Sequence, residues 1–196
     1  MPMATVKRKY RVLVAGSGDR VFDFISELLP PGGFEPILRA GDAGEVRRML
    51  LDTPVDIVII NTPLSDDFGV ELALDLAEGT TGVLLLVKNE LYDQVCYKVE
   101  DSGVLTLGKP MTRQGFYSAV KLLSAVTARL SKMEKVNRTL QEKMADIRVV
   151  NRAKWLLIEH HHMKEQDAHY FIEKQAMDTR LSRREVAENI IRTYDL

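Results

Sequence analysis

Three short polar segments directly follow apolar runs in the sequence: Gly16-Ser17, Asn61 and Lys109. Open α/β sheets bind ligands at the carboxyl ends of their strands, which leaves open a small effector near these residues. Their own chemistry is limited, because an asparagine amide is neutral and a poor nucleophile. Gly16-Ser17-Gly18 lacks the spacing of a dinucleotide or Walker phosphate loop and is more typical of a tight strand-to-helix turn. The set therefore offers an amide and a cation but no catalytic nucleophile–base pair.

These residues are positioned by an alternation of β-branched runs and helical patterns over residues 1–111. The runs that we expect to be strands are 11–15, 34–39, 55–60, 83–87 and 104–107. The third and fourth are largely apolar, as expected for strands covered on both faces of a parallel sheet. Between the runs lie apolar stripes with helical spacing. The alternation predicts a doubly wound, flavodoxin-like α/β domain with a five-stranded parallel sheet.

This order of elements resembles a response-regulator receiver domain. The resemblance also rests on Asn61-Thr62-Pro63 after the third strand, on Gly69, and on Lys109-Pro110 after the fifth strand. It implies that two acidic residues follow strand one, that a phosphoacceptor aspartate follows strand three, and that a hydroxyl residue follows strand four. In this sequence the corresponding positions hold Gly16 and Ser17, Asn61, and Val87, and only Lys109 is retained. The receiver pocket is therefore degenerate.

The substitutions remove the phosphoryl-transfer chemistry of a receiver. Without a carboxylate at Asn61 no acyl phosphate can form, and without the acidic pair Mg²⁺ loses its anionic ligands. The nearby acids, Asp19, Asp66 and Asp67, are displaced from the required positions. We therefore predict that phosphorylation does not control this domain. Lys109 has two interpretations at this point, a retained receiver lysine or a surface lysine before a proline that can be cis.

From Thr112 onward the pattern becomes helical, and residues 112–147 are predicted to form a coiled-coil linker. Apolar residues recur at alternating spacings of three and four, as in the a and d positions of a heptad seam. Asn137 occupies an a position, where a buried asparagine fixes the register of a parallel dimer. The alternative is that the helix packs along its own domain, as its first turns are expected to do. The predicted dimerisation residues are Leu123, Val126, Leu130, Met133, Asn137, Leu140, Met144 and Ile147.

Residues 148–196 read as a small all-α domain of three helices, the last opened by a Ser182–Glu185 capping box. Their order and spacing resemble the ANTAR family, named for amidase- and nitrate-regulator antitermination proteins. The residues that carry the resemblance are Ala153-Lys154 with Leu156-Leu157-Ile158, Asp167-Ala168, Phe171-Ile172, the run Lys174 to Arg180, Val186-Ala187-Glu188 and Ile190-Ile191. The sequence departs from the family at Trp155, His169-Tyr170 and Glu173, where glycine, an aromatic–basic pair and a basic residue are common.

The ANTAR resemblance implies binding to paired stem-loops in nascent messenger RNA, usually by a dimer, so that a terminator hairpin does not form. Our candidate RNA-binding residues are Arg152, Ala153, Lys154, Tyr170, Ala176 and Arg180. Hairpin loops need few contacts, namely stacking on aromatic or guanidinium faces and some phosphate partners. The alternative for each basic residue is a solvated helix face. The alanines are better suited to close packing of helices, or of RNA, than to energetic contacts.

Charge supports nucleic-acid binding only in part. Residues from Arg148 on carry nine basic and eight acidic side chains, a net charge of +1. This is not a broad electrostatic footprint for RNA. The linker is more basic, with seven basic residues against three acidic ones between Thr112 and Ile147.

Two further features of the C-terminal part have competing interpretations. Trp155 is expected to be a core aromatic, given its apolar neighbours, with a stacking platform for bases as the alternative. The triplet His160-His161-His162 is not expected to bind metal, because adjacent residues on a helix point about 100° apart. A polar corner between helices is the simpler interpretation. We expect no metal and no cofactor.

The sequence predicts a cytoplasmic protein without a membrane segment, since Cys96 is its only cysteine and no apolar run reaches the length of a transmembrane helix. The favoured function is an RNA-binding antitermination regulator that acts as a coiled-coil dimer and independently of phosphorylation, with no enzymatic activity. A regulatory sensor protein is an open partner. The alternative is a non-catalytic signalling scaffold whose C-terminal helices bind protein.

Overall fold

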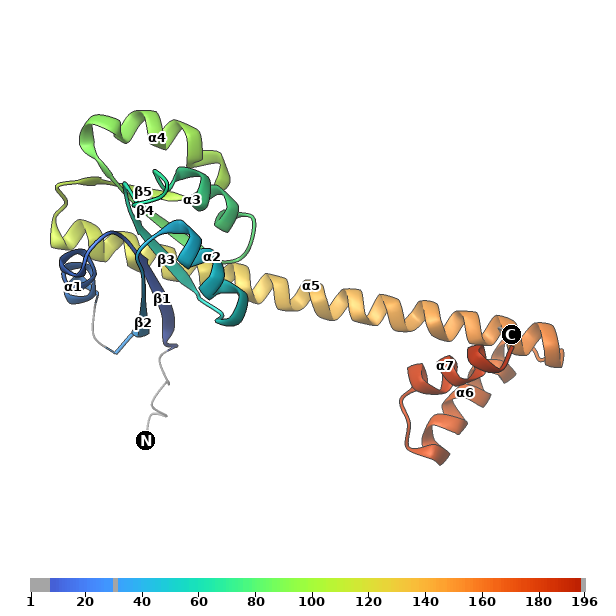
Figure 1. Ribbon diagram of the computed structural model, residues 1–196. Helices are drawn as coiled ribbons and strands as arrows, with labels where there is room; N and C mark the ends of the chain where they lie inside the picture. The colour runs from blue at the N-terminus through green and yellow to red at the C-terminus, as the bar shows by residue number, and fades with distance from the viewer. Residues whose placement is uncertain (1–7, 30–31, 195–196) are drawn as a thin grey trace. The chain divides into compact units, whose positions relative to one another are not determined.

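The computed structural model describes residues 8–29 and 32–194, so the predicted domain ends at 1–7 and 195–196 lie outside the described residues. The chain divides into two compact units, Met1–Met133 and Glu134–Leu196. One helix, α5 (Arg113–His161), contributes residues to both units (Figure 1). Each unit is described separately below.

The first unit contains a parallel sheet of five strands in the order β2-β1-β3-β4-β5. This confirms the fold predicted for the N-terminal half. The strands are β1 (Tyr10–Ala15), β2 (Phe34–Ala40), β3 (Ile57–Asn61), β4 (Gly82–Lys88) and β5 (Leu105–Lys109). Because the strands are parallel, β3 and β5 bring Asn61 and Lys109 to the same edge of the sheet.

Helices cover both faces of the sheet, as the apolar strands require (Figure 1). One core packs β-strand residues against α2 (Ala43–Asp52), α3 (Val70–Ala77) and α4 (Tyr92–Val99). The other packs them against α1 (Asp19–Leu28) and the first turns of α5. Short 3₁₀ turns at Asn89–Leu91 and Glu100–Ser102 flank α4. The sheet is therefore buried on both sides without help from another chain.

The first turns of α5 belong to this unit, as one of the two interpretations predicted. Phe116 and Val120 are fully buried against the sheet. The helix lies so close to the start of β4 that a Cβ added at Gly82 would come within 2.9 Å of the Leu123 side chain. Leu123 is only 5% exposed, so its assignment to the dimer seam was wrong. It is buried in the receiver core instead.

The second unit packs the end of α5 against α6 (Glu165–Thr179) and α7 (Arg183–Tyr194). Its core is small and contains several alanines, which let the helices approach closely. The buried apolar residues are Ala153, Leu157, Ala168, Ile172, Ala176, Val186 and Ala187. The predicted capping box opens α7, where the Glu185 amide donates to Ser182 Oγ at 3.2 Å and the Ser182 amide donates to Glu185 Oε2 at 2.7 Å.

Candidate nucleic-acid interface and degenerate receiver pocket

In the receiver pocket Lys109 points at the position of the missing phosphoacceptor. Its Nζ donates hydrogen bonds to Asn61 Oδ1 at 2.8 Å and to the Thr62 carbonyl at 2.7 Å. Lys109 is only partly exposed, and burial, with a smaller contribution from the nearby Lys88, lowers its pKa. The structure therefore favours the interpretation of Lys109 as a retained receiver lysine over that of a free surface lysine.

The other predicted pocket residues supply no charge. Gly16 is buried, and a Cβ there would lie 3.0 Å from Val21 and 3.3 Å from the Asn61 Cβ, so the loop after β1 packs tightly against Asn61. Ser17 is exposed and Val87 is fully buried in the core. None of these side chains supplies a carboxylate ligand for a divalent cation.

The nearby acids do not replace the missing ones. Asp66 accepts hydrogen bonds from the amides of Ala43 and Gly44 at 2.9 and 3.0 Å, which lowers its pKa. Asp67 accepts from the Gly69 amide, and Asp19 pairs with Arg39. Within the part of the chain that the structure describes, no group of His, Cys, Asp and Glu side chains is arranged to hold a metal ion.

Helix α5 carries a stripe of exposed apolar side chains outside the three hydrophobic cores. Six predicted seam residues are 41–59% exposed: Val126, Leu130, Met133, Leu140, Met144 and Ile147. They recur at spacings of four, three, seven, four and three, and the exposed Asn137 fills the gap of seven. Large apolar side chains in such a regular row are typical of a helix that is covered by a partner helix.

The predicted RNA-binding residues do not form one cluster. Ala153 is fully buried and Ala176 nearly so, because both fill the three-helix core; predicting them as RNA contacts was wrong. Arg152 and Tyr170 are exposed, and Tyr170 presents 63% of its surface. Arg180 is exposed and ends α6 in a left-handed conformation.

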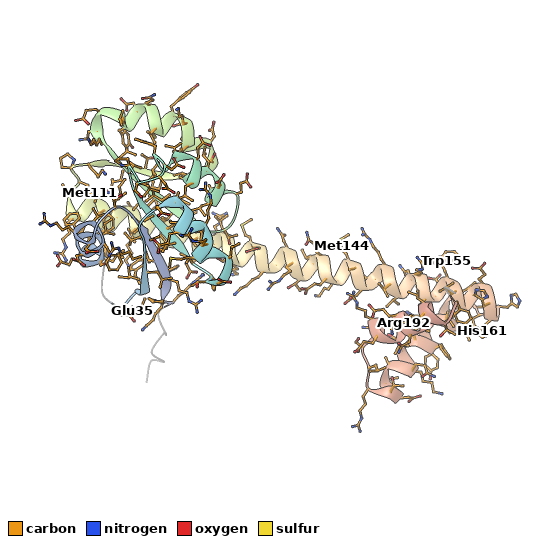
Figure 2. The ribbon with its side chains drawn as sticks, viewed as in Figure 1. Glu35, Met111, Met144, Trp155, His161 and Arg192 are labelled. Carbon is orange, nitrogen blue, oxygen red and sulfur yellow. The ribbon has the colours of Figure 1, made fainter. Side chains whose placement is uncertain are left out.

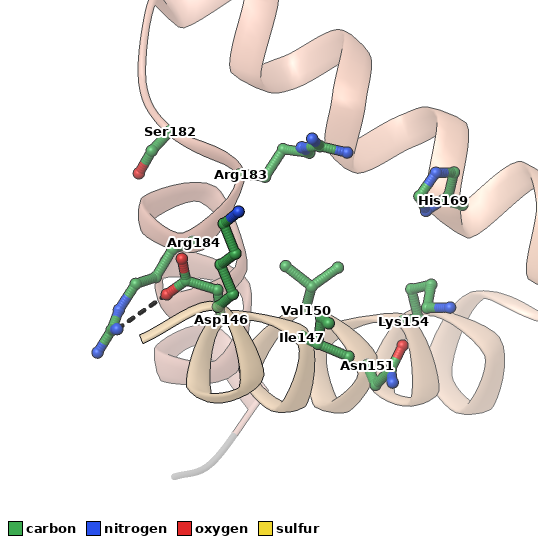
Figure 3. A pocket seen from close by; sticks show the side chains of 10 residues that line it. Asp146, Ile147, Val150, Asn151, Lys154, His169, Ser182, Arg183 and Arg184 are labelled. Carbon is green, nitrogen blue, oxygen red and sulfur yellow. Dashed lines mark hydrogen bonds and ion pairs between the residues drawn. The ribbon is translucent and has the colours of Figure 1, made fainter. Parts of the chain in front are cut away.

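Lys154 lies in a groove of about 670 Å³ that sequence reasoning did not identify (Figure 3). Apolar residues of α5 line its floor, and basic residues line its walls. The lining residues are Lys143, Asp146, Ile147, Val150, Asn151, Lys154, His169, Ser182, Arg183 and Arg184. The signal available in the sequence was the pair Arg183-Arg184 just inside the capping box, which places two guanidinium groups at the start of a helix.

Ion pairs hold several of the cations in this groove. Lys154 Nζ lies 3.1 Å from Glu165, and Arg183 lies 3.0 Å from Glu173. Arg184 pairs with Asp146 at 2.9 Å (Figure 3), and it also pairs with Glu188 at 2.8 Å. These ion pairs are partly exposed, so each contributes little to stability. They orient the cations, and the cations can exchange their carboxylate partners for phosphate groups.

Trp155 is 70% exposed, so the prediction of a core aromatic was wrong. Ala153 and Leu157 face the domain core, and Trp155 lies between them in the sequence on another side of the helix (Figure 2). The exposed Arg152 is one turn away on the same helix. An exposed indole beside a guanidinium group offers flat surfaces on which unpaired bases can stack.

The histidine triplet forms a corner between helices. His160 stacks on the Tyr194 ring of α7 with a centroid distance of 4.8 Å, and His161 Nε2 is hydrogen-bonded to Tyr194 Oη. His162 follows the end of α5 with a positive φ of 52°. The triplet therefore joins α5 to α7.

Comparisons with known proteins agree with both units. The family model of the ANTAR domain matches residues 138–191. The chain is 27% identical over 184 residues to the transcriptional regulatory protein PdtaR of Mycobacterium tuberculosis, covering 93% of this chain and 90% of that protein. It is 27% identical over 145 residues to the aliphatic amidase regulator of Pseudomonas aeruginosa, covering 71% of this chain and 72% of that protein.

The N-terminal fold also matches a solved structure, the signal receiver domain of an HD domain-containing protein from Pseudomonas fluorescens Pf-5. The TM-score is 0.57 at 23% identity, and the match covers 68% of this chain and 98% of the receiver domain. At this identity the match shows the fold alone. Across the described residues, no helix is both long and apolar enough to span a bilayer.

Proposed function

The chain is an ANTAR response regulator, in which a receiver-fold domain precedes an ANTAR domain, and we propose that it binds RNA hairpins as a dimer and acts in transcription antitermination independently of phosphorylation. The observation that carries the proposal is the ANTAR match over residues 138–191. The exposed aromatic and basic side chains of that domain support it. We further propose that the protein is cytoplasmic and has no catalytic activity.

Independence from phosphorylation follows from the receiver pocket. The acceptor position holds the amide of Asn61, already hydrogen-bonded to Lys109, and an amide oxygen is not a nucleophile toward phosphorus. The glycine and serine after β1 provide no anionic ligands for Mg²⁺. Control must therefore come from another input, such as a sensor protein or a ligand. Stoichiometric labelling of the N-terminal half by acetyl phosphate with Mg²⁺ would contradict this part of the proposal.

The dimer follows from the seam on α5. Burial of a Leu, Ile, Met or Val side chain stabilises by about 1.5–3 kcal/mol, and the six such residues of the seam are exposed in a single chain. Pairing two copies along this seam would remove them from water and place two ANTAR domains in one molecule. Two linked domains bind adjacent hairpins with a raised effective concentration.

Binding to RNA is assigned to the exposed side chains of the ANTAR domain. Trp155 and Tyr170 supply stacking surfaces, while Lys154, Arg152 and Arg180 are phosphate partners. The groove adds Arg183 and Arg184, whose ion pairs exchange for phosphate contacts. Stacking on aromatic side chains and a few phosphate contacts do not require a large net positive charge. This mode of binding therefore fits the nearly neutral net charge of the domain.

A second candidate function is a signalling scaffold whose C-terminal helices bind a protein. The specific observation in its favour is the pairing of Lys154, Arg183 and Arg184 with acids, which leaves little excess positive charge. Exposed aromatic residues also suit a protein partner.

A mobility-shift titration with an RNA that carries two adjacent hairpins distinguishes the two functions. We expect salt-sensitive binding that falls about tenfold in Lys154→Ala and in Arg180→Ala, because each loses a charged contact. Lys98→Ala on α4 is the matched control, since it removes one charge outside the ANTAR domain. Absence of binding by the full-length dimer, or equal losses in Lys98→Ala, would favour the scaffold.

A further inference from the structure

The receiver-fold unit contains a cavity beside the degenerate pocket that none of the functions above uses. It has a volume of about 340 Å³ and lies between α1 and the segment that leads from β5 into α5. Asn61 and Lys109 stand at one end, at the carboxyl edge of the sheet. This is the edge at which open α/β sheets bind small ligands.

Charge at the cavity is positive. Lys109 and Arg20 both line it, and Lys88 lies close enough to contribute to the lowered pKa of Lys109. Among the residues that the structure describes, no carboxylate forms an ion pair with Lys109 or Arg20. The acids of the surrounding loops are held elsewhere, Asp19 by Arg39 and Asp66 by the amides that open α2.

Hydrogen-bonding capacity also favours an anion. An ammonium group has three donors, and Lys109 uses two of them on Asn61 and Thr62. Lys109 occupies one of the two lone pairs of Asn61 Oδ1, and the Asn61 amide nitrogen adds N–H donors for a further partner. A partly buried cation without an anionic partner is costly, and a bound anion relieves that cost.

The remaining walls of the cavity are apolar. Val21, Phe24 and Ile25 come from α1, Leu86 from β4, and Met111 from the segment before α5. Phe24 is a large apolar side chain that remains about half exposed at the cavity, so an apolar ligand group would gain by covering it. The volume lies at the lower end of the range of small-molecule pockets.

We propose that this cavity binds a small organic carboxylate, with the carboxylate on Lys109 and Arg20 and its apolar body against Phe24 and Met111. The ligand replaces, from outside, the acidic groups that the receiver pocket has lost. It contacts both α1 and the residues that precede α5. The pocket thereby supplies an input that needs neither Mg²⁺ nor a phosphoryl group.

The test compares benzoate with its neutral isostere benzamide on the full-length protein without Mg²⁺. Binding is followed by the amide NMR shifts of Gly16, Phe24 and Met111. We expect benzoate to bind at least about tenfold more tightly than benzamide, because charge-assisted hydrogen bonds are worth about that factor. Lys109→Met should lower the affinity ratio of the two ligands severalfold toward one, with Arg20 left as the remaining cation.

Two further variants keep the test independent of any folding defect in Lys109→Met. Asn61→Asp retains the lysine but pairs it with a carboxylate, so the preference for benzoate should also fall. Arg48→Gln removes an exposed cation on α2, away from the cavity, and should leave the ratio unchanged. Equal affinity of wild type for benzoate and benzamide, no saturable benzoate binding, or a preference that is undiminished in both Lys109→Met and Asn61→Asp would overturn the proposal.

Discussion

The receiver-fold unit and the ANTAR unit bury their apolar side chains in different ways. The receiver-fold unit sandwiches a five-stranded sheet between two helical layers, and strands β1 to β4 all contribute buried residues to the two cores. The ANTAR unit has one small core of three helices, in which four of the seven buried residues are alanines. Exposed aromatic and apolar residues, including Trp155, Tyr170 and Met144, lie around that core.

This difference indicates which unit depends on partners. A doubly wound domain can lose its catalytic acids and keep its fold, because none of those acids contributes to the core. A small helical unit of about sixty residues is marginal on its own and gains from association. We therefore expect substitutions on the exposed face of α5 to change assembly, and substitutions in either core to change folding.

The largest effect is expected at the seam. Leu130→Asp with Leu140→Asp removes four buried leucines from each dimer, a loss of about 6 kcal/mol even at about 1.5 kcal/mol for each side chain. Association should weaken by about four orders of magnitude. Both positions are exposed in a single chain, so the monomer should keep its fold. Analytical ultracentrifugation and far-UV circular dichroism measure the two quantities.

Ser131→Asp with Thr139→Asp is the matched control for this prediction. It adds the same two charges to α5 outside the seam, at the partly exposed Ser131 and the exposed Thr139. We expect it to remain a dimer. A wild-type protein that sediments as a monomer, or equal dissociation of both double variants, would contradict the assignment of the seam.

A smaller effect is expected when either core is truncated. Phe116→Ala should cost the receiver-fold unit about 3–5 kcal/mol, and Ile172→Ala should cost the ANTAR unit about 2–5 kcal/mol, because each side chain is fully buried. Trp155 is the only tryptophan, so its fluorescence reports on the ANTAR unit. In urea, Phe116→Ala should shift the circular dichroism transition while the fluorescence transition stays in place. A shift of both by the same amount would show that the units unfold together.

The fold of each unit was predictable because its signals are local and consistent. The apolar runs gave all five strands within two residues at each end, and the capping box gave the start of α7. The degenerate pocket was also predictable, since strand order brings Asn61 and Lys109 to one edge of the sheet. These conclusions need only the positions of residues along the chain.

The incorrect predictions concern which face of helix α5 is buried against the rest of its unit. Leu123 fits the heptad spacing, yet the same spacing also serves the receiver core, and only the close approach at Gly82 distinguishes the two. Ala153 and Trp155 are two residues apart on α5, and apolar pairs occur on both sides of this segment, Val149-Val150 before it and Leu156-Leu157 after it. Spacing alone does not say where α6 and α7 pack, so Trp155 was wrongly assigned to the core, and Ala153, for which helix packing was one of two alternatives, was wrongly included among the RNA contacts.

The smallest effect is expected at the capping box, which tests whether the ANTAR unit is stabilised locally as well as by its core. Ser182→Ala removes the acceptor for the Glu185 amide and should destabilise this unit by about 1 kcal/mol. Hydrogen bonds from Ser182 lower the pKa of Glu185, so the ionised box stabilises the fold above the pKa that Glu185 has in the unfolded chain. That contribution is lost as the pH falls through the lowered folded-state pKa. Urea titration with tryptophan fluorescence measures the free energy of unfolding of this unit in wild type and in Ser182→Ala. The difference between the two free energies should shrink at acidic pH. A difference that does not depend on pH would show that Glu185 contributes nothing through its charge.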